Sequence, residues 1–332
     1  MKTTLFVSAL IGSLAVAAIN AQQPPAARAA AAAPTPEVRS KYVQGDVWMI
    51  NAGFVNVAVQ VGSEGVLVVD TGTEALAPKI LAEIQKLAEG KPIRYIVNTH
   101  SHADHTGGNV TIAKAGKSII AGNFAPQAGA EAANQAKIVA HENVQLRMSE
   151  GEGKQPPAPT MALPTDTFFT KRFDLYFDGE AVQLLHQPNA HTDGDVIAYF
   201  RKSDVIAAGD VYINTTFPVI NLQQGGSING IIAALNRIID LAIPDHKVQE
   251  GGTMIVPGHG RLCDEQDVIE YRDMVTIIRD RVQYMIGKGR TLDQIKAAKP
   301  TLDFDGRYGA TSGPWTTTMF VEQIYRDLTK KK

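Results

Sequence analysis

The chain has 332 residues, a formal net charge of −2 and a single cysteine, Cys263. One large α/β domain could use most of this length. Lysine and arginine are scattered as far as the final Lys330–Lys332, so the sequence shows no basic footprint for a nucleic acid. A single cysteine excludes both an intramolecular disulfide and a thiolate zinc cage. Any bound metal must therefore be held by histidine and carboxylate side chains.

The first 21 residues are organised like a secretory signal peptide. Lys2 precedes the apolar run Leu5–Ala18, and small residues follow as far as Ala21, with cleavage expected at Ala18 or Ala21. The run is shorter than the roughly 20 residues that cross a bilayer, which favours export with cleavage over a stable membrane anchor. Residues 22–40 are rich in Ala and Pro and are expected to form a linker. One folded domain is then expected over residues 41–332, in the periplasm or outside the cell.

Strands and helices are expected to alternate in the first half of this domain. The spacing of apolar residues predicts a helix from about Ile80 that stops at Gly90. Residues 126–148 are Ala-rich and are also expected to be helical, with a Pro/Gly-rich loop over 151–164. Apolar and β-branched runs predict strands at 47–50, 55–59, 66–69, 95–97 and 118–121.

The second half begins with strands and ends with helices. Strands are expected around residues 175, 184 and 197, at 205–208 and at 254–256, with a helix over 228–239 between the last two. An apolar stripe from Val268 to Met285 predicts a long helix that Gly287 or Gly289 ends. Thr291 and Gln294 form the capping box of a further short helix. Strands mixed with helices in both halves indicate two packed sheets with helices outside.

Three of the eight histidines lie in the sequence His100-Ser101-His102-Ala103-Asp104-His105. This cluster directly follows the predicted strand 95–97, so it lies on a loop whose base a strand holds fixed. Side chains alternate in an extended chain, so His100 and His102 can hold one ion together. Asp104 and His105 follow the turn and can reach a second ion. Packing these polar groups together brings no structural gain, so the sequence predicts a metal site.

The stretch from Asn98 to Gly108 resembles the HxHxDH signature of the metallo-β-lactamase superfamily. Shorter motifs follow the family's order: Asp70 before Thr71-Gly72, His191 between Ala190 and Thr192, Asp210 after Gly209, and His259 after Pro257-Gly258. The six-residue signature is specific, whereas the shorter motifs count through their order and their placement after predicted strands. The resemblance extends across the mature chain and implies an α/β fold, the αββα sandwich of two mixed sheets flanked by helices.

The resemblance also implies a ligand set for each of two zinc ions. The implied ligands are His100, His102 and His191 for one ion, Asp104, His105 and His259 for the other, and Asp210 as the bridge. Asp70 would accept a hydrogen bond from a ligand histidine and fix its tautomer. Imidazole and carboxylate also suit iron and manganese, so these metals are alternatives to zinc.

Two such ions would lower the pKa of a shared water towards neutrality, so no serine or cysteine nucleophile is needed. Asp104 or Asp210 could orient the nucleophile and pass a proton to the leaving group. The loop 151–164 and the segment 217–227 could form the walls of the pocket. The residues expected to contact a substrate carbonyl or carboxylate are Tyr212, Asn214 and Thr215.

The family hosts many reactions, so its fold does not name the substrate. Export and amide-opening chemistry fit the β-lactamases, but one lactamase subclass has cysteine at the position of Asp210 and another has serine. A bridging aspartate is more typical of lactonases, thioesterases and phosphodiesterases. We expect a small-molecule substrate with a cyclic amide or ester bond, with a thioester or phosphodiester as the alternative. A metal-binding protein without turnover is the alternative from another class.

The remaining titratable candidates are expected to be structural or exposed. His141 is placed in the predicted helix, either solvated or at the rim of the pocket. His186 is expected to be structural, and His246 is expected in a surface loop. Cys263 is expected to be a small buried residue.

Overall fold

The computed structural model describes Met1 and residues 36–119, 134–151, 156–245 and 251–330. The expected signal peptide after Met1 and most of the expected linker lie outside these ranges. Strand β1 (Val38–Gln44) begins inside the stretch 22–40 that was expected to be a linker. It pairs antiparallel with β2 (Val47–Ala52), with Val38 opposite Ala52. The folded part therefore begins before residue 41, because pairing with β2 extends the sheet into the polar residues ahead of it.

The first half of the chain builds a seven-stranded mixed sheet in the order β1-β2-β3-β4-β5-β6-β7. Neighbouring strands are antiparallel from β1 to β4 and parallel from β4 to β7. The other five strands are β3 (Val55–Val61), β4 (Val66–Val69), β5 (Ile93–Val97), β6 (Lys137–His141) and β7 (Asp166–Phe168).

The second half builds a five-stranded sheet in the order β12-β11-β10-β9-β8. Only the β11–β12 pair is parallel among these strands, and the others are antiparallel. The strands are β8 (Arg172–Phe177), β9 (Glu180–His186), β10 (Val196–Phe200), β11 (Val205–Ile213) and β12 (Met254–His259). The chain thus finishes one sheet before it begins the other.

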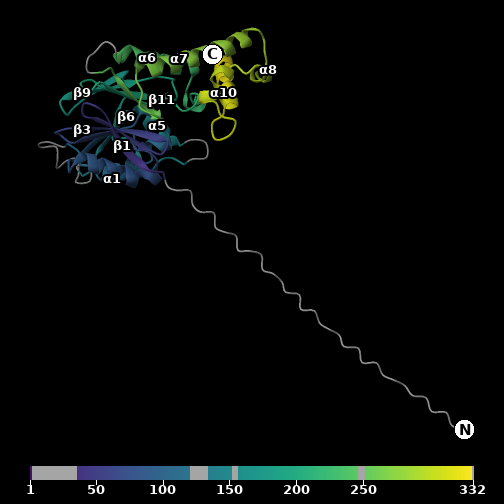
Figure 1. The fold of residues 1–332 in the computed structure, drawn as a ribbon. Helices are drawn as coiled ribbons and strands as arrows, with labels where there is room; N and C mark the ends of the chain where they lie inside the picture. Colours follow the sequence, from purple (N-terminus) through teal and green to yellow (C-terminus); the bar gives the residue numbers. More distant parts are fainter. Residues whose placement is uncertain (2–35, 120–133, 152–155, 246–250, 331–332) are drawn as a thin grey trace. The chain divides into compact units, whose positions relative to one another are not determined.

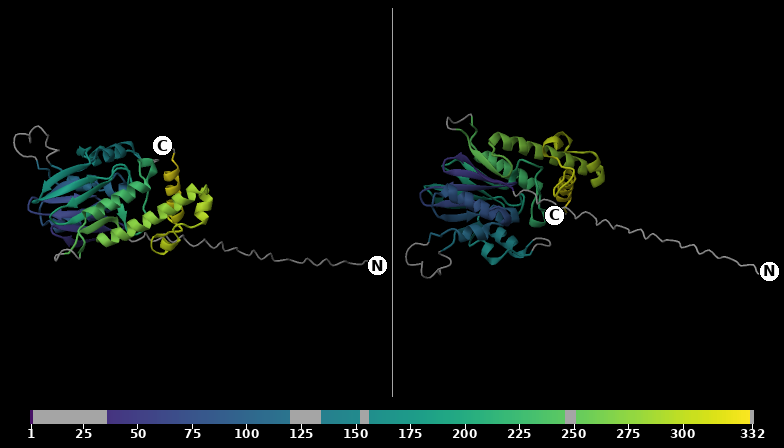
Figure 2. Two further views of the ribbon diagram at one scale, coloured as in Figure 1. Left: turned by 90° about the horizontal axis from the view of Figure 1, so that it is seen from above. Right: turned by 60° about the horizontal axis from the view of Figure 1, so that its bottom comes forward.

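Helices cover the outer face of each sheet, as Figures 1 and 2 show. Helix α1 covers the seven-stranded sheet, while α6 and α7 lie together over the five-stranded sheet. The helices on the first side are α1 (Ala77–Ala88), α2 (Ala103–Thr106), α3 (Asn109–Lys114) and α5 (Glu142–Glu150). Those on the second side are α6 (Ile228–Leu241), α7 (Glu265–Gly287), α8 (Leu292–Ala297), α9 (Asp305–Tyr308) and α10 (Thr317–Thr329).

Three main apolar cores separate the layers. One lies between the sheets and includes Leu67 and Val97 from the first sheet with Leu184 and Ala207 from the second. A second core joins the outer face of the first sheet to α1, and a third joins the second sheet to α6, α7 and α10. The predicted αββα sandwich is therefore confirmed, since two helix layers enclose two mixed sheets.

The helix ends follow the expected capping chemistry. Asp264 accepts a hydrogen bond from the backbone N–H of Asp267, and the two residues form a capping box at the start of α7. The predicted box of Thr291 and Gln294 is present at the start of α8. Helix α7 ends at Gly287, as the apolar stripe indicated.

Two predictions of secondary structure were wrong. The helix expected over residues 126–148 contains strand β6, which pairs parallel with β5 and β7. Ile138, Val139 and Ala140 are buried there, so packing between the layers overrides the helical composition of the stretch. Only α5 within that range is helical among the described residues. Ser118 and Ile119 are not in a strand, and the rest of the strand expected at 118–121 lies outside the described residues.

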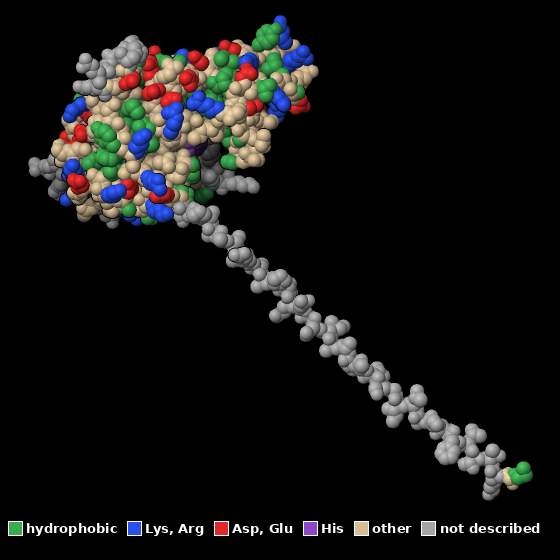
Figure 3. Space-filling model, viewed as in Figure 1, with side chains coloured by type: hydrophobic (Ala, Val, Ile, Leu, Met, Phe, Trp, Pro, Cys, Tyr) green, Lys and Arg blue, Asp and Glu red, His purple; other side chains and the backbone are tan. Residues whose placement is uncertain are grey.

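The described surface carries interspersed charges on the face drawn in Figure 3. Lysine and arginine alternate there with aspartate and glutamate, and a histidine is visible inside a hollow. None of the helices in the described part of the chain is long and apolar enough to cross a bilayer.

Candidate metal centre

The loop after β5 positions the predicted cluster of histidines. His102 keeps an extended backbone and is the N-cap of α2, so the chain turns into that helix directly after it. The backbone N–H of His105 donates to the carbonyl of His102 at 3.0 Å. This turn places His100 and His102 in one group of side chains and Asp104 and His105 in another, as the spacing predicted.

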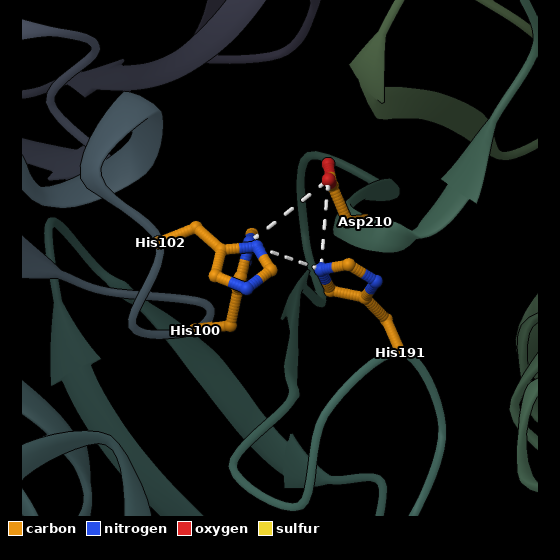
Figure 4. A group of neighbouring side chains, drawn as sticks. All are labelled: His100, His102, His191 and Asp210. Atoms are coloured by element: carbon orange, nitrogen blue, oxygen red, sulfur yellow. Dashed lines mark hydrogen bonds and ion pairs between the residues drawn. The ribbon is translucent and has the colours of Figure 1, made fainter. Parts of the chain in front are cut away.

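The first group combines residues from both sheets (Figure 4). His100 and His102 approach from the loop after β5, His191 from the loop between β9 and β10, and Asp210 from β11. One nitrogen or oxygen from each residue lies within 4.8 Å of the corresponding atoms of the others. The Nδ1 of His102 is 2.9 Å from the Nε2 of His191.

The second group lies beside the first. His259 ends β12, and its Nε2 is 3.4 Å from the Nε2 of His105 and 3.5 Å from the Oδ2 of Asp104. The Asp104 oxygen is 3.7 Å from the Nε2 of His105. All three ligand atoms therefore face a common point.

Asp210 lies between the two groups and presents one oxygen to each. Its Oδ1 is 3.2 Å from the Nε2 of His105 and 3.1 Å from the Nε2 of His259. Its Oδ2 is 3.9 Å from the Nε2 of His100 and 3.8 Å from the Nε2 of His191. A carboxylate placed in this way can contact two cations at once, which is the arrangement expected of a bridging ligand.

The position of Asp210 in the fold differs from the prediction. It was expected in the turn after a short strand, but β11 continues through it to Ile213. The register with β12 shifts around Gly209, which has a φ of +52°. At Gly258 on β12, a Cβ atom would lie 2.1 Å from the Oδ1 of Asp210. An irregular strand and a glycine on its neighbour therefore make room for the carboxylate.

The donor set fits divalent cations. The Nε2 of His100 is buried and has no hydrogen-bond partner among the described residues, which is costly unless a bound group satisfies it. Five imidazoles and two carboxylates converge here, and these ligands are typical of zinc, iron or manganese sites.

Hydrogen bonds on the far side of the rings fix their orientation. The Nδ1 of His105 is 2.7 Å from the Oδ2 of Asp70, as predicted. The Nδ1 atoms of His191 and His259 lie 2.8 Å and 2.7 Å from the backbone carbonyls of Val219 and Phe54. A proton on each Nδ1 leaves Nε2 with its lone pair towards the centre, which is how a metal-binding histidine is usually held.

Sequence analysis missed most of these partners. A backbone carbonyl carries no residue-specific pattern, so Val219 and Phe54 could not be found in this way. Thr99 stands next to the motif, and its hydroxyl lies 3.1 Å from the Nδ1 of His100. The side-chain amide of Asn221 is 3.0 Å from the Nε2 of His102.

Burial and charge separate the two groups of histidines. Burial, together with the neighbouring His105, holds the pKa of His100 well below its usual range, and burial lowers the pKa of His191 to about 4. Burial also opposes charge on His105, but Asp210 and Asp70 outweigh it and raise its pKa well above the usual value. The pKa of His259 is raised in the same way, because Asp210 outweighs its burial. The rings nearest the two carboxylates therefore hold protons most strongly.

Three cavities open around the centre. One of about 700 Å³ is lined by His102, Asp104 and Glu74. A second of about 620 Å³ lies between His102 and the segment 156–162, and a third of about 620 Å³ is lined by Asp210 and His259. The described parts of the loop 151–164 and Val219 of the segment 217–227 do line cavities, as expected. Glu74 was not expected at the site.

The expected substrate contacts are placed unequally. Thr215 is exposed and lines the same cavity as Asp210 and His259. Asn214 uses its amide to hold the carbonyl of Arg261 at 2.8 Å. The prediction for Tyr212 was wrong, because its side chain is 1% exposed and its hydroxyl contacts the sulfur of Cys263. The register of β11 shifts between Gly209 and Ile213, so regular alternation is interrupted and Tyr212 packs in the core with α7 although it is two residues from Asp210.

The two other histidines among the described residues, His141 and His186, do not join the centre. His141 is buried at the end of β6 and stacks on His186 with ring centroids 3.6 Å apart. It was expected in a helix, either solvated or at the rim of the pocket; the helix was wrong, and burial rules out the solvated alternative. Burial lowers the pKa of His141 to about 4. His246 lies outside the described residues. Cys263 is buried, as predicted.

The fold and the histidine motif define a protein of the αββα class with a candidate metal centre. The model of the metallo-beta-lactamase superfamily matches residues 50–259, so the chain belongs to this family. The match covers all the candidate ligands, from His100 to His259. Members of this family are metal-dependent hydrolases.

Two curated relatives share this region. A linear primary-alkylsulfatase from Pseudomonas sp. (strain ATCC 19151) is 25% identical over 258 residues, which cover 70% of this chain and 47% of the relative. The alpha subunit of a 2,4-dinitroanisole O-demethylase from Nocardioides sp. (strain JS1661) is 27% identical over 220 residues, 64% of this chain and 58% of the relative. The chain thus spans about half the length of these relatives.

Solved structures agree on the fold. The sec-alkylsulfatase Pisa1 from Pseudomonas sp. superposes with a TM-score of 0.59 at 14% identity, covering 87% of this chain and 50% of that protein. The DIM-1 metallo-beta-lactamase superposes with a TM-score of 0.51 at 18% identity, covering 73% of this chain and 98% of that protein. At these identities the likeness concerns the fold alone.

Proposed function

We propose that this chain is a zinc-dependent hydrolase that cleaves a small carboxyl ester or lactone. The observation that carries the proposal is the placement of Asp210, which presents one carboxylate oxygen to each of two groups of histidines. When bound there, two zinc ions would lower the pKa of a water molecule and polarise the bond to be cleaved.

The geometry supports two ligand sets. One ion would be held by His100, His102 and His191 and the other by Asp104, His105 and His259, with Asp210 shared. Imidazole and carboxylate ligands also suit iron and manganese. The metal-replacement test below therefore measures with which ion the protein is most active.

The two carboxylates have different tasks because they differ in exposure. The side chain of Asp104 is 28% exposed and lines a cavity, so its Oδ2 can take a proton from the attacking water and deliver it to the leaving group. The side chain of Asp210 is 7% exposed and enclosed by imidazoles, which suits it to hold the centre together. Asp70 keeps the ring of His105 in the orientation this requires.

An ester or lactone is favoured over a β-lactam by the residue at position 210. This sequence has an aspartate there, whereas the lactamase subclasses that the sequence resembles have cysteine or serine. The relatives support a second candidate, because their names describe cleavage of an alkyl sulfate and of an aryl methyl ether. A sulfate ester or an activated aryl ether is therefore the alternative substrate class.

Metal removal and substrate comparison test the proposal. Chelated protein should lose hydrolysis of 4-nitrophenyl acetate and of a lactone, and zinc should restore it at about two ions per chain by elemental analysis. The same panel should include nitrocefin, an alkyl sulfate and 2,4-dinitroanisole, and replacement by iron and by manganese. Full activity after chelation would refute metal dependence. Two tightly bound ions without turnover of any substrate would show a binding protein instead.

A variant tests the ligand assignment separately. Asp104→Ala should bind about one ion per chain, because the Asp104 carboxylate lies next to His105 and His259, which belong to one of the two groups. Two ions in this variant would contradict the assignment.

A further inference from the structure

We propose that the cavity beside His102 is a subsite for an uncharged, apolar acyl or alkyl group of the substrate. The inference rests on the proposed function, since it assigns the substrate of that same centre. It makes the substrate a neutral ester with an extended apolar group.

The apolar part of this cavity's wall comes from three separate parts of the chain, and the histidine loop and Gln224 supply polar groups beside it. Val110 of α3 and Met148 of α5 line it, and the segment 156–162 supplies Pro157, Pro159 and Met161. Its volume of about 620 Å³ is within the range of small-molecule pockets. A cavity with walls of this composition gains free energy by removing hydrocarbon from water.

The segment 156–162 is fixed in place by hydrogen bonds to both helices. The backbone N–H of Ala158 donates to the carbonyl of Met148 at 2.8 Å. The carbonyl of Ala162 accepts from the buried side-chain amide of Asn109 at 2.8 Å. The side-chain oxygen of Asn109 accepts from the hydroxyl of Thr71, which also contacts the carbonyl of His105. One network of polar side chains therefore fixes the position of the cavity wall relative to the histidine loop.

The cavity adjoins the candidate metal centre. His102, Ala103 and Gly107 line both this cavity and the one that contains Asp104. A molecule with its reactive carbonyl near Asp104 can therefore extend a side group past His102 and between α3 and α5. The occupant is thus a part of the substrate itself.

The charges around the centre favour a neutral group. Arg147 is the cation that lines the apolar cavity among the described residues, and its Nη2 is already 2.6 Å from the Oδ2 of Asp193. Arg261 lines the cavity beside His259 and is paired with Asp267. Glu74 lines the apolar cavity as well and would repel a carboxylate or sulfate. A hydrocarbon tail meets none of these penalties.

A chain-length series provides the test. For 4-nitrophenyl esters from acetate to hexanoate, kcat/KM should rise about fourfold per added methylene, which corresponds to about 0.8 kcal/mol for each. Met161→Glu should flatten this dependence, because it places a charge on the cavity wall, and Met161→Leu should keep it. Met161 is 48% exposed, so the substitution can be made without opening the core.

A matched control lies on α5. Leu146 is 50% exposed and does not line the cavity, so Leu146→Glu adds the same charge nearby and should leave the chain-length dependence unchanged. Melting temperatures of the variants confirm that each is folded.

Equilibrium binding separates the subsite from the reaction. In calorimetry, hexanamide should bind both the chelated and the zinc-loaded protein. It should bind the Met161→Glu variant at least tenfold more weakly. Hexyl sulfate should bind the chelated protein more weakly than hexanamide does. Equal chain-length slopes in wild type and Met161→Glu would overturn the subsite while leaving ester hydrolysis intact. Hexanamide binding that depends on Met161 without hydrolysis of any ester would overturn the proposed function and keep the subsite.

Discussion

Asp70 controls which nitrogen of His105 carries the proton. Its Oδ1 accepts from the backbone N–H of Thr99 at 2.8 Å, and its Oδ2 lies 2.7 Å from both the Thr99 hydroxyl and the Nδ1 of His105. Asp70→Asn keeps the shape but puts an amide N–H₂ where the second oxygen stood. The ring of His105 must then carry its proton on Nε2, which faces Asp210.

The size of the effect follows from these contacts. Losing the hydrogen-bond partner of a metal-binding histidine lowers metal affinity about 10- to 100-fold. This corresponds to about 1.4–2.7 kcal/mol, which agrees with the roughly 1.5–3 kcal/mol of a hydrogen bond to a charged group. We expect the loss at the ion held by Asp104, His105 and His259. The ion held by His100, His102 and His191 should be affected much less.

Competition with a fluorescent zinc chelator measures both affinities. Asp178→Asn is the matched control, because Asp178 is also buried, also has a positive φ and also accepts a backbone N–H. It lies in the turn between β8 and β9, and its acceptor oxygen takes the N–H of Glu64 before β4, away from the histidines. The control should bind both ions with wild-type affinity. Two ions bound to Asp70→Asn with affinities within threefold of wild type would refute the reasoning.

Three further outcomes are expected. As the pH falls below 7, zinc should leave the group of His105 and His259 first, because the raised pKa values of these two histidines let protons compete with the metal. His191, with a pKa of about 4, should stay neutral and keep its ion. Chelator competition from pH 8 to 5 would show one ion lost before the other. Gly209→Ala should lower the free energy of unfolding by about 1–3 kcal/mol in urea titrations, since it has a φ of +52° and its Cβ would lie 2.5 Å from the Thr99 hydroxyl oxygen. Chelation should lower the melting temperature, because the stabilisation by bound zinc grows with the logarithm of the free zinc concentration. An unchanged melting temperature would contradict zinc binding to the folded state.

The sequence predicted the ligand cluster well because the relevant constraint is local. His100 and His102 are two residues apart in an extended stretch, and their common direction depends only on side-chain alternation. The same holds for the capping box of Thr291 and Gln294, which needs one helical turn. Features of this kind are set by a few neighbouring residues.

The errors arose where distant parts of the chain decide. Lys137–His141 forms a strand because β5 and β7 offer hydrogen-bond partners on both sides, which the Ala-rich sequence around it does not reveal. Tyr212 was expected to touch substrate, but the extension of β11 sets its direction and turns it into the core. The carbonyls of Val219 and Phe54 that hold two histidine rings have no counterpart in residue type at all.

The division of the chain between the two sheets has a consequence for assembly. Strands β1 to β7 end at Phe168 and β8 begins at Arg172, so one short turn separates the two halves of the fold. The first half carries the histidine loop, and the second carries His191, Asp210 and His259. The centre thus lies at the interface between the two halves, and neither half alone holds a complete set of ligands for either ion. Two fragments divided at this turn would reassociate more tightly with zinc than without it. Metal binding would therefore stabilise, reversibly, the association of the two halves of one protein.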